Sequence, residues 1–141
     1  MLPENFSFFL PYTVSIKDIN YGGHVGNDVF LSYFQEARIA YLQHLGFSEL
    51  NIGGNGLILV KAEVEYKAEL FHKDPVKLFA GITEMKNSSF IMDYLIVKEG
   101  EIIAATGKTV LVSFDYQERK VKKIPVDFRN RVKEFETSKN F

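Results

Sequence analysis

Residues 18–28, Asp-Ile-Asn-Tyr-Gly-Gly-His-Val-Gly-Asn-Asp, run directly into an apolar segment that carries Glu-Ala-Arg at 36–38. The first stretch gathers polar and titratable groups into a glycine-rich loop, and the second is expected to be a helix that begins where the loop ends. Free backbone N–H groups and the positive end of the helix dipole meet at such a helix N-terminus. They would stabilise a carbonyl oxygen that gains negative charge, so the pattern favours acyl transfer or hydrolysis.

The helix is predicted from about Asp28 to Leu45, because apolar side chains recur there at steps of three and four residues. Gly46 follows as a residue suited to end it. The apolar side chains cover most of the helix circumference, so the helix is expected to be buried. The remaining narrow polar stripe consists of Asp28, Ser32, Gln35, Glu36 and Gln43.

Most of the remaining chain has the pattern of β-strands. Between Val60 and Leu70, apolar residues alternate strictly with charged ones, which predicts a long strand with one buried face and one solvated face. Together with three later strands it is expected to form an antiparallel meander of four strands after the helix. The later strands are predicted to begin at Val76 and to span 90–97 and 102–114, and a short strand is predicted over 13–18.

Long strands beside one apolar helix predict an α+β fold, in which a long antiparallel β-sheet wraps around one central α-helix. Residues 1–141 are expected to form a single domain, because the chain shows no repeat, no linker and no change of composition. One sheet with one helix leaves exposed strand edges and a poorly covered flank. Self-association is therefore expected, with a homodimer whose sheets join edge to edge as the simplest form.

Composition excludes several functional classes. A formal net charge of −1 gives no general attraction to nucleic acid or to a membrane surface. The absence of cysteine excludes disulfides, thiolate metal sites and a cysteine nucleophile, and we predict no metal and no cofactor. The chain has no basic signal-peptide segment and no apolar stretch long enough to span a bilayer, which favours a cytoplasmic protein.

The loop resembles the Asp-x-Asp-x-x-Gly-His-Val-Asn-Asn signature of hotdog-fold acyl-CoA thioesterases of the 4-hydroxybenzoyl-CoA thioesterase-like group, in which a helix with Tyr-x-x-Glu-Ala-Arg follows. Residues 66–75 and 124–125 are similar to later parts of that pattern, so the resemblance covers nearly the whole chain. It implies a hotdog fold, dimers that often pair into tetramers, and hydrolysis of an acyl-CoA or acyl-carrier-protein thioester at the dimer interface. The matching residues are Asp18, Gly23, His24, Val25, Asn27, Phe34, Glu36, Ala37, Arg38, Leu45 and Gly46.

The sequence departs from this signature at the position of the catalytic acid. Asn20 stands where the family carries its second Asp, and a carboxamide cannot accept a proton or attack a carbonyl at neutral pH. Gly26 replaces the first Asn of the Asn-Asn pair. Asp28 lies just after the motif and is the candidate replacement for the missing acid.

The predicted catalytic residues are Asn20, His24 and Asp28, and Asn27 is the predicted substrate-binding residue. His24 with Asp28 would activate water, since an imidazole exchanges its proton near neutral pH. The loop also resembles that of plant acyl-carrier-protein thioesterases, in which the equivalent histidine is catalytic. Asn20 would position the water, and the backbone N–H of Asn27 would polarise the thioester carbonyl.

Each of these assignments has a structural alternative. Asp28 could cap the helix, and Asn20 could brace the loop as an Asx turn. Glu36 lies too far along the helix axis from Asp28 to act on the same carbon, and it is expected to pair with Arg38 of a neighbouring chain or to brace the structure.

Two other functions stay open. A dehydratase or hydratase on the same fold would use His24 and Glu36 to move protons on a 3-hydroxyacyl thioester. A non-catalytic acyl- or CoA-binding protein would explain Asn20. Basic residues near the C-terminus would suit the phosphates of coenzyme A, although such a run is also common on a solvated face. They are Arg119, Lys120, Lys122, Lys123, Arg129, Arg131 and Lys133.

Overall fold

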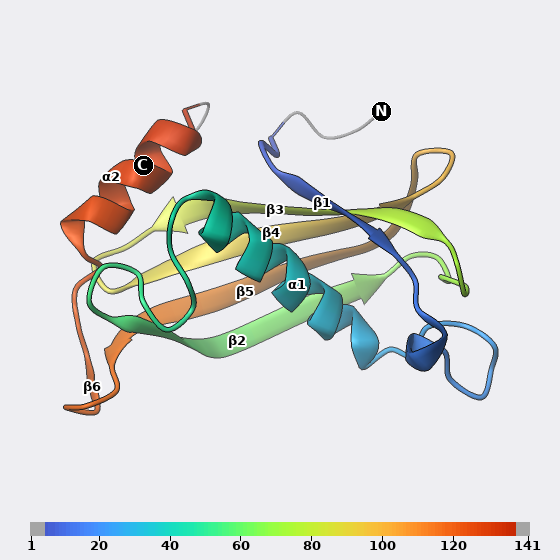
Figure 1. Cartoon of the computed structure of the whole chain (residues 1–141), viewed down its shortest axis with the longest axis horizontal. Helices are drawn as coiled ribbons and strands as arrows, with labels where there is room; N and C mark the ends of the chain where they lie inside the picture. Colours follow the sequence, from blue (N-terminus) through green and yellow to red (C-terminus); the bar gives the residue numbers. More distant parts are fainter. Residues whose placement is uncertain (1–4, 138–141) are drawn as a thin grey trace.

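The computed structural model describes residues 5–137 (Figure 1). A long antiparallel sheet curls around one central helix, which confirms the predicted α+β hotdog architecture. The elements, in chain order, are β1 (Phe9–Thr13), a 3-10 turn (Ile16–Asp18), α1 (Val29–His44), β2 (Gly56–Tyr66), β3 (Pro75–Met85), β4 (Ser89–Lys98), β5 (Ile102–Asp115), β6 (Lys120–Val121) and α2 (Val126–Phe135).

The strands lie in the order β1-β3-β4-β5-β2, and β6 pairs with the end of β5. All pairs are antiparallel. The predicted meander of four strands is therefore wrong for β2, which pairs with β5 rather than with β3. The connection 67–74 carries the chain from β2 across to β3, and Leu70 anchors it with a fully buried side chain. β1 and β2 form the two edges of the sheet.

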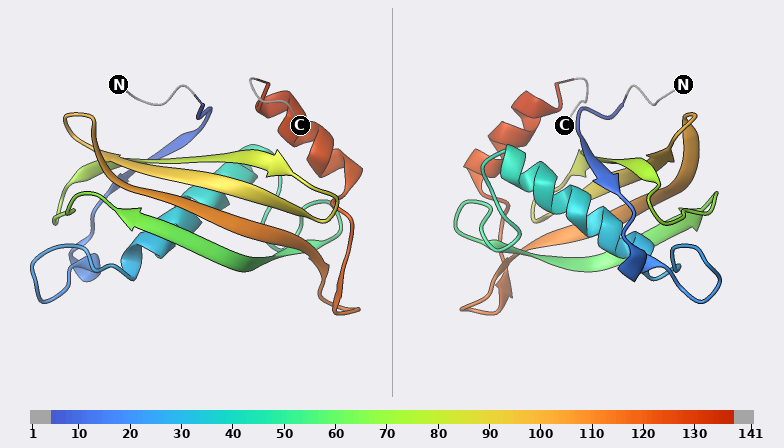
Figure 2. Two further views of the ribbon diagram at one scale, coloured as in Figure 1. Left: turned by 180° about the vertical axis from the view of Figure 1, so that it is seen from behind. Right: turned by 45° about the vertical axis from the view of Figure 1, so that its right-hand side comes forward.

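The central helix α1 begins and ends as predicted. Asp28 takes its N-cap position and Leu45 its C-cap position, and Gly46 has a φ of +92°. Figure 2 shows α1 against the concave face of the sheet. Gly107 of β5 allows this close approach, because a Cβ there would clash with the Phe34 ring.

Burial of α1 is confirmed for one face only. Its sheet-facing side chains, Tyr41 and Leu42 among them, are fully buried. Leu31 and Ile39 on the other face are 42% and 45% exposed. Neither α1 nor the other helix of residues 5–137 is long and apolar enough to cross a lipid bilayer.

Three local predictions need correction. The strand expected over 13–18 lies earlier, at β1, because Ser15 accepts the N–H of Lys17 and starts a 3-10 turn that leaves Ile16 64% exposed. The strand expected between Val60 and Leu70 runs from Gly56 to Tyr66 instead. The short β6 and the helix α2 were not predicted. Half of the residues of α2 are charged, and the helix packs through two fully buried side chains, Phe128 and Val132.

Candidate active site

The loop before α1 is held closed by its own backbone. Ile19 and Val25 form an antiparallel bridge, and the N–H of Asn20 donates to the carbonyl of His24 at 2.9 Å. The N–H of Gly23 donates back to the carbonyl of Asn20 at 3.1 Å, with Gly23 at a φ of +82° that favours glycine. The loop therefore presents its side chains from a fixed hairpin-like frame.

The side chain of Asn20 takes part in this frame. Its Oδ1 accepts the N–H of Gly22 at 2.8 Å, which is the geometry of an Asx turn. The structural alternative for Asn20 is thus observed, because its carbonyl oxygen is already engaged. The amide nitrogen and the second lone pair of Oδ1 are left to hold a water or a substrate.

Tyr33 of α1 ties the start of the loop to the helix. Its hydroxyl donates to Oδ2 of Asp18 at 2.9 Å, and the carbonyl of Asp18 accepts the N–H of Gly26 at 3.3 Å. Burial, and then the hydrogen bond to Asp18, raise the pKa of Tyr33 well above its ordinary value. Tyr33 therefore stays protonated and remains a donor. Its hydrogen bond holds Asp18, the first Asp of the signature, against α1.

His24 has an acceptor at each ring nitrogen. Its Nδ1 lies 3.0 Å from the carbonyl oxygen of Val25, and its Nε2 lies 3.3 Å from Oε2 of Glu69. A carbonyl and a carboxylate only accept hydrogen bonds, so a doubly protonated ring would donate to both. In this arrangement His24 is set up as a donor, and it can act as a base only after Nε2 leaves Glu69. The Glu69 side chain is 62% exposed, so water can reach this contact.

Two N–H groups at the start of α1 are available to a ligand. Within residues 5–137, the backbone N–H groups of Asn27 and Asp28 donate to no other protein group. The hydroxyl of Tyr66, at the end of β2, donates to the carbonyl of Asn27 at 2.9 Å. In a trans peptide the C=O and the next N–H point in opposite directions. Tyr66 therefore fixes the direction of the Asp28 N–H.

A cavity of about 240 Å³ brings several of these groups together. It lies between the loop, the first turn of α1 and the end of β2. Asp28 is absent from its lining, is exposed, and makes no side-chain hydrogen bond that caps α1. The structure thus pairs His24 with Glu69 rather than with Asp28. The lining residues are His24, Val25, Asn27, Phe30, Tyr66, Lys67, Ala68 and Glu69.

Glu69 and Tyr66 were both missed as site residues by sequence reasoning. Glu69 lies within the alternating stretch 60–70, where it looks like one more solvated carboxylate. Tyr66 looks like an ordinary strand residue in the same stretch. Only the pairing of β2 with β5, which places the end of β2 beside the loop, brings them to His24 and Asn27.

Arg38 is held within its own chain. It is 4% exposed, and its guanidinium donates to the hydroxyl of Tyr94 at 3.0 Å and contacts Oε2 of Glu49 at 3.5 Å. Burial raises the pKa of Tyr94, and the Arg38 charge opposes that rise. Glu36 is exposed on α1 and has no ion pair with a described residue. Arg38 thus has partners within its own chain, and the expected pair between Glu36 and Arg38 of a neighbouring chain stays a prediction.

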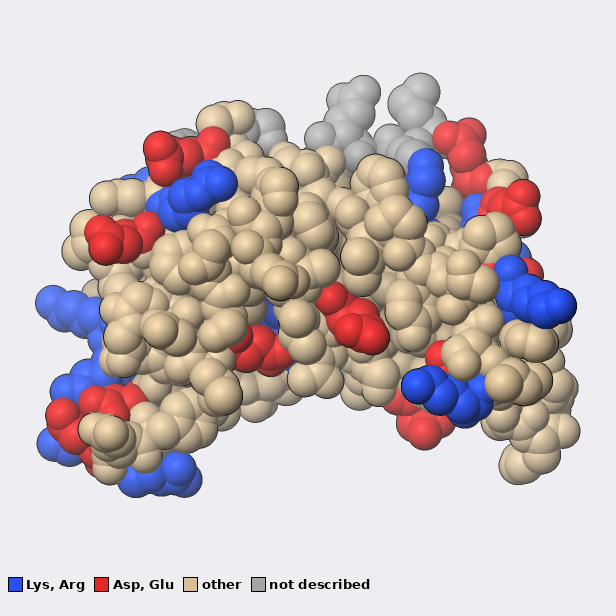
Figure 3. Space-filling model, in the orientation of Figure 1, with Lys and Arg blue, Asp and Glu red and all other residues tan. Residues whose placement is uncertain are grey.

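The predicted basic residues lie away from the loop. Arg119, Lys120, Lys122 and Lys123 sit on the hairpin of β5 and β6, at the end of the molecule opposite residues 18–28 (Figures 1 and 2). Figure 3 shows Lys and Arg side chains gathered at that end. Arg129 of α2 is structural, since it donates to the carbonyl of Lys86 at 2.7 Å.

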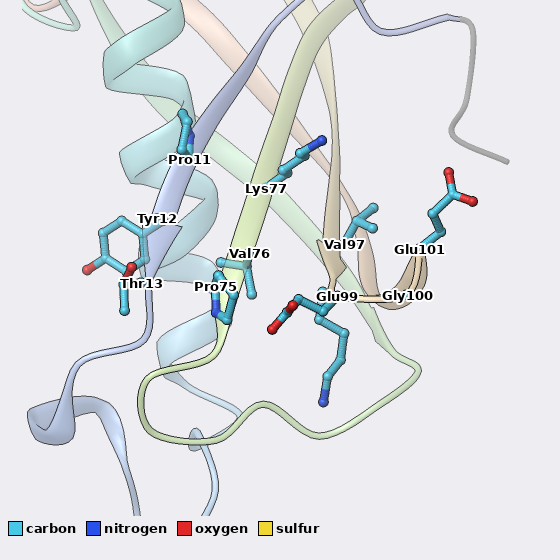
Figure 4. A pocket seen from close by; sticks show the side chains of 11 residues that line it. Pro11, Tyr12, Thr13, Pro75, Val76, Lys77, Val97, Glu99, Gly100 and Glu101 are labelled. Atoms are coloured by element: carbon cyan, nitrogen blue, oxygen red, sulfur yellow. The ribbon is translucent and has the colours of Figure 1, made fainter.

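A larger cavity of about 630 Å³ lies between β1, the start of β3 and the turn that joins β4 to β5 (Figure 4). Two lysines and two glutamates line it: Lys77, Lys98, Glu99 and Glu101. Lys98 is already paired with Asp74 at 3.4 Å. The charges balance, so this cavity offers nothing that selects an anionic ligand.

Comparison with known proteins identifies the family of this chain. The sequence model of the thioesterase-like superfamily matches residues 14–132, which is most of the chain. The chain belongs to this superfamily. A thioesterase of Thermus thermophilus, whose structure was solved in complex with coenzyme A and Zn, is 30% identical to it. That alignment covers 96% of this chain and 98% of the other, with a TM-score of 0.84.

Two relatives known by sequence agree with this placement. The Escherichia coli acyl-CoA thioester hydrolase YbgC is 25% identical over 120 residues, which are 84% of this chain and 90% of that protein. A relative in Aquifex aeolicus is 31% identical over 84 residues, 58% of this chain. The latter alignment spans 66% of that protein, slightly less than two thirds of its length. Within residues 5–137 of this chain, no group of three or more His, Asp or Glu side chains is placed to hold a metal ion.

Proposed function

We propose that this protein hydrolyses an acyl-CoA thioester to the free acid and coenzyme A. The observation that carries the proposal is the backbone N–H of Asn27, unbonded within the described chain, at the start of α1 in the cavity that His24 also lines. Membership of the thioesterase-like superfamily supports this chemistry. The names of the Escherichia coli and Thermus thermophilus relatives support coenzyme A as the carrier.

The chemistry follows from what each group can donate or accept. The thioester carbonyl oxygen accepts from the N–H groups of Asn27 and Asp28, whose positions at the helix N-terminus favour the negative charge of the tetrahedral intermediate. A water adds to the carbonyl carbon and gives up a proton, the C–S bond breaks, and the proton returns to the thiolate. His24 is the proposed proton carrier, with Asn20 holding the water and Glu69 as the partner of His24. The role predicted for Asp28 as a second proton carrier stays a prediction from the sequence, since its side chain does not line the cavity.

The test is thiol release from a panel of short, long and aromatic acyl-CoAs, and from the same acyl groups on a carrier protein. Saturable release by the wild-type protein is expected with acyl-CoA. Release of no thiol from any of them by folded protein would contradict the proposal. Formation of an enoyl thioester without thiol release would instead identify a hydratase.

We also propose that two chains pair through their β2 edges. β2 is eleven residues long, contains no proline, and exposes Leu59 and Val60 by 43% and 57%. The other edge strand, β1, has five residues with Pro11 at its centre, and such an edge resists pairing. The exposed apolar residues of α1 give the same flank a second contact. Light scattering should give the mass of a dimer or of a dimer of dimers. A homotetramer, a cytoplasmic location and a single domain over 1–141 stay predictions from the sequence.

A further inference from the structure

The connection 67–74 carries Glu69 to His24 and is tied to the loop through its backbone. The carbonyl of Leu70 accepts the N–H of Val25 at 2.8 Å, and the Leu70 side chain is fully buried. Glu69 lies one residue before this anchor. Among residues 5–137, the Glu69 carboxylate makes one ion pair, with His24, and no other hydrogen bond. The place of this carboxylate therefore depends on how the backbone of Glu69 is held.

Lys98, the last residue of β4, holds that backbone. Its Nζ donates to the Glu69 carbonyl at 2.8 Å, and no other donor reaches this oxygen within the part of the chain that the structure describes. The ammonium also lies 3.4 Å from Oδ2 of Asp74 and 5.2 Å from the centroid of the Phe71 ring. The Lys98 side chain is 19% exposed, so these contacts are largely shielded from water. An ammonium has three protons and no lone pair, so Lys98 binds this segment purely as a donor.

Asp74 and Phe71 form a turn that does not need Lys98 to close. Oδ2 of Asp74 accepts the N–H of Phe71 at 2.9 Å, and the N–H of Asp74 donates to the Phe71 carbonyl at 3.0 Å. Without the ammonium the turn keeps both of these hydrogen bonds, whereas the Glu69 carbonyl loses its donor. A loss of Lys98 should therefore be felt at Glu69 first.

Two successive peptide units set the direction in which Glu69 points. A trans peptide is planar, so a donor on its carbonyl restrains the rotation of the whole unit. Lys98 restrains the unit that follows Glu69 from the side of the sheet, and Val25 restrains the unit that follows Leu70 from the side of the loop. With both units held, Oε2 of Glu69 lies 3.3 Å from Nε2 of His24.

We propose that Lys98 is a positioning residue of the active site, whose hydrogen bond to the Glu69 carbonyl holds the Glu69 carboxylate beside His24. This inference rests on the proposed function, in which His24 carries the proton. Lys98 touches no reacting atom, and its effect on turnover passes through Glu69. The end of β4, far in the sequence from the loop motif, thus takes part in the site.

The first test is Lys98→Met, which keeps the apolar stem of the side chain and removes its donors. For acyl-CoA hydrolysis, kcat should fall about threefold to tenfold, no more than in Glu69→Gln, because the carboxylate that orients His24 is less well placed. KM should stay at the wild-type value, since Lys98 does not contact the substrate. An unchanged kcat in folded protein, or a change in KM alone, would overturn the proposal.

Lys77→Met is the matched control. Lys77 lines the same 630 Å³ cavity as Lys98 (Figure 4), and its Nζ lies 5.0 Å from the centroid of the Phe9 ring. Among the described residues it makes no hydrogen bond or ion pair with the connection 67–74. This variant also loses a cation beside an aromatic ring, and it should keep the wild-type kcat and KM. Equal losses of kcat in the two variants would contradict a specific role for Lys98.

A double-mutant cycle tests the path through Glu69. If Lys98 acts only by placing this carboxylate, Lys98→Met/Glu69→Gln should turn over at about the rate of Glu69→Gln alone. Losses that multiply would mean that Lys98 supports the fold or acts elsewhere, and they would overturn the proposal. The cycle also decides the question if Lys98→Met lowers the melting temperature, because a purely structural loss multiplies with the loss from Glu69→Gln.

A measurement without turnover separates this inference from the proposed function. The NMR shifts of the imidazole nitrogens report the hydrogen bonds of each ring, and His24→Ala identifies the His24 signals among those of three histidines. Lys98→Met should move the Nε2 signal of His24 toward its position in Glu69→Gln, and Lys77→Met should leave it in place. If the wild type hydrolyses no acyl-CoA, the proposed function fails, whereas this movement would still support the placement of Glu69 by Lys98. An Nε2 signal that Lys98→Met leaves unchanged would overturn the proposal.

Discussion

The two ends of α1 are built in opposite ways. At the N-terminal end, polar groups are partly exposed, the contacts are local, and two backbone N–H groups have no protein acceptor within residues 5–137. At the C-terminal end, the hydroxyl of Tyr41 donates to Oε2 of Glu136 at 2.7 Å, and both residues are fully buried. The Ile82 N–H donates to the same oxygen at 3.2 Å, so one buried carboxylate joins α1, β3 and the end of α2.

This difference separates function from stability along one helix. Open hydrogen-bonding groups cost stability unless water or a ligand satisfies them, so they are kept where a ligand arrives. A buried carboxylate with buried donors ties distant segments together, and its loss weakens the whole fold. Substitutions at the two ends should therefore have separable effects, one on turnover and the other on unfolding.

The largest effect is expected at the open end. His24→Ala should lower kcat for acyl-CoA hydrolysis by about a hundredfold or more, because a group that moves the proton is lost. The melting temperature should change little, since the side chain is 28% exposed and its contacts are with exposed or backbone groups. Steady-state kinetics and thermal unfolding on the same preparation check both parts. Unchanged turnover would remove His24 from the mechanism.

The next effect is expected at the closed end. Tyr41→Phe should lower the free energy of unfolding by about 2 kcal/mol, because the buried Glu136 loses a donor. Burial, and then Glu136, raise the pKa of Tyr41, so the hydroxyl is a donor at every working pH. Urea unfolding measures the change, and kcat should stay at the wild-type value. Tyr116→Phe is the matched control: its hydroxyl donates to the Leu57 carbonyl at 2.6 Å from a side chain that is 42% exposed, and a smaller loss is expected.

Local patterns in the sequence were sufficient to predict that the helix α1 and the long strands are present. The period of apolar residues predicted α1 to within one residue at each end, and strict alternation predicted β2 but placed it four residues too late. The order of the strands could not be predicted in this way, because pairing of β2 with β5 joins residues about fifty positions apart. Helix α2 was missed since its charged residues outnumber the few side chains, such as Phe128, that dock it.

The candidate site also combines residues from one local motif with partners that are distant in the sequence. The loop residues His24 and Asn27 were predicted because they match neighbouring positions of the thioesterase signature. Their partners Glu69 and Tyr66 come from β2 and the connection after it, 45 and 39 positions further along the chain. A carboxylate partner of His24 was predicted at Asp28, whereas the carboxylate that lies beside the ring in the structure is that of Glu69.

Two carboxylates near the N-terminal end of α1, Glu69 and Asp28, should contribute differently to turnover. Glu69→Gln should lower kcat about tenfold, because the carboxylate that orients the His24 ring through Nε2 is replaced by a neutral amide. Asp28→Asn should have the smaller effect, since the Asp28 side chain lies outside the cavity and makes no cap. The pH–rate profiles of both variants decide between them. A larger loss in Asp28→Asn would make Asp28 the proton carrier and Glu69 a surface residue.

The smallest effect concerns the direction of one peptide. Tyr66→Phe removes the donor to the Asn27 carbonyl but keeps the ring, which packs edge-on against Phe30 with centroids 5.1 Å apart. The peptide between Asn27 and Asp28 then loses one restraint, so the Asp28 N–H is less well aimed at the thioester oxygen. We expect kcat to fall about threefold to tenfold with KM nearly constant, less than for the loss of a whole oxyanion donor. A rise in KM with unchanged kcat would mean that Tyr66 contacts the bound acyl-CoA instead, and that the open end of α1 is oriented by the loop alone.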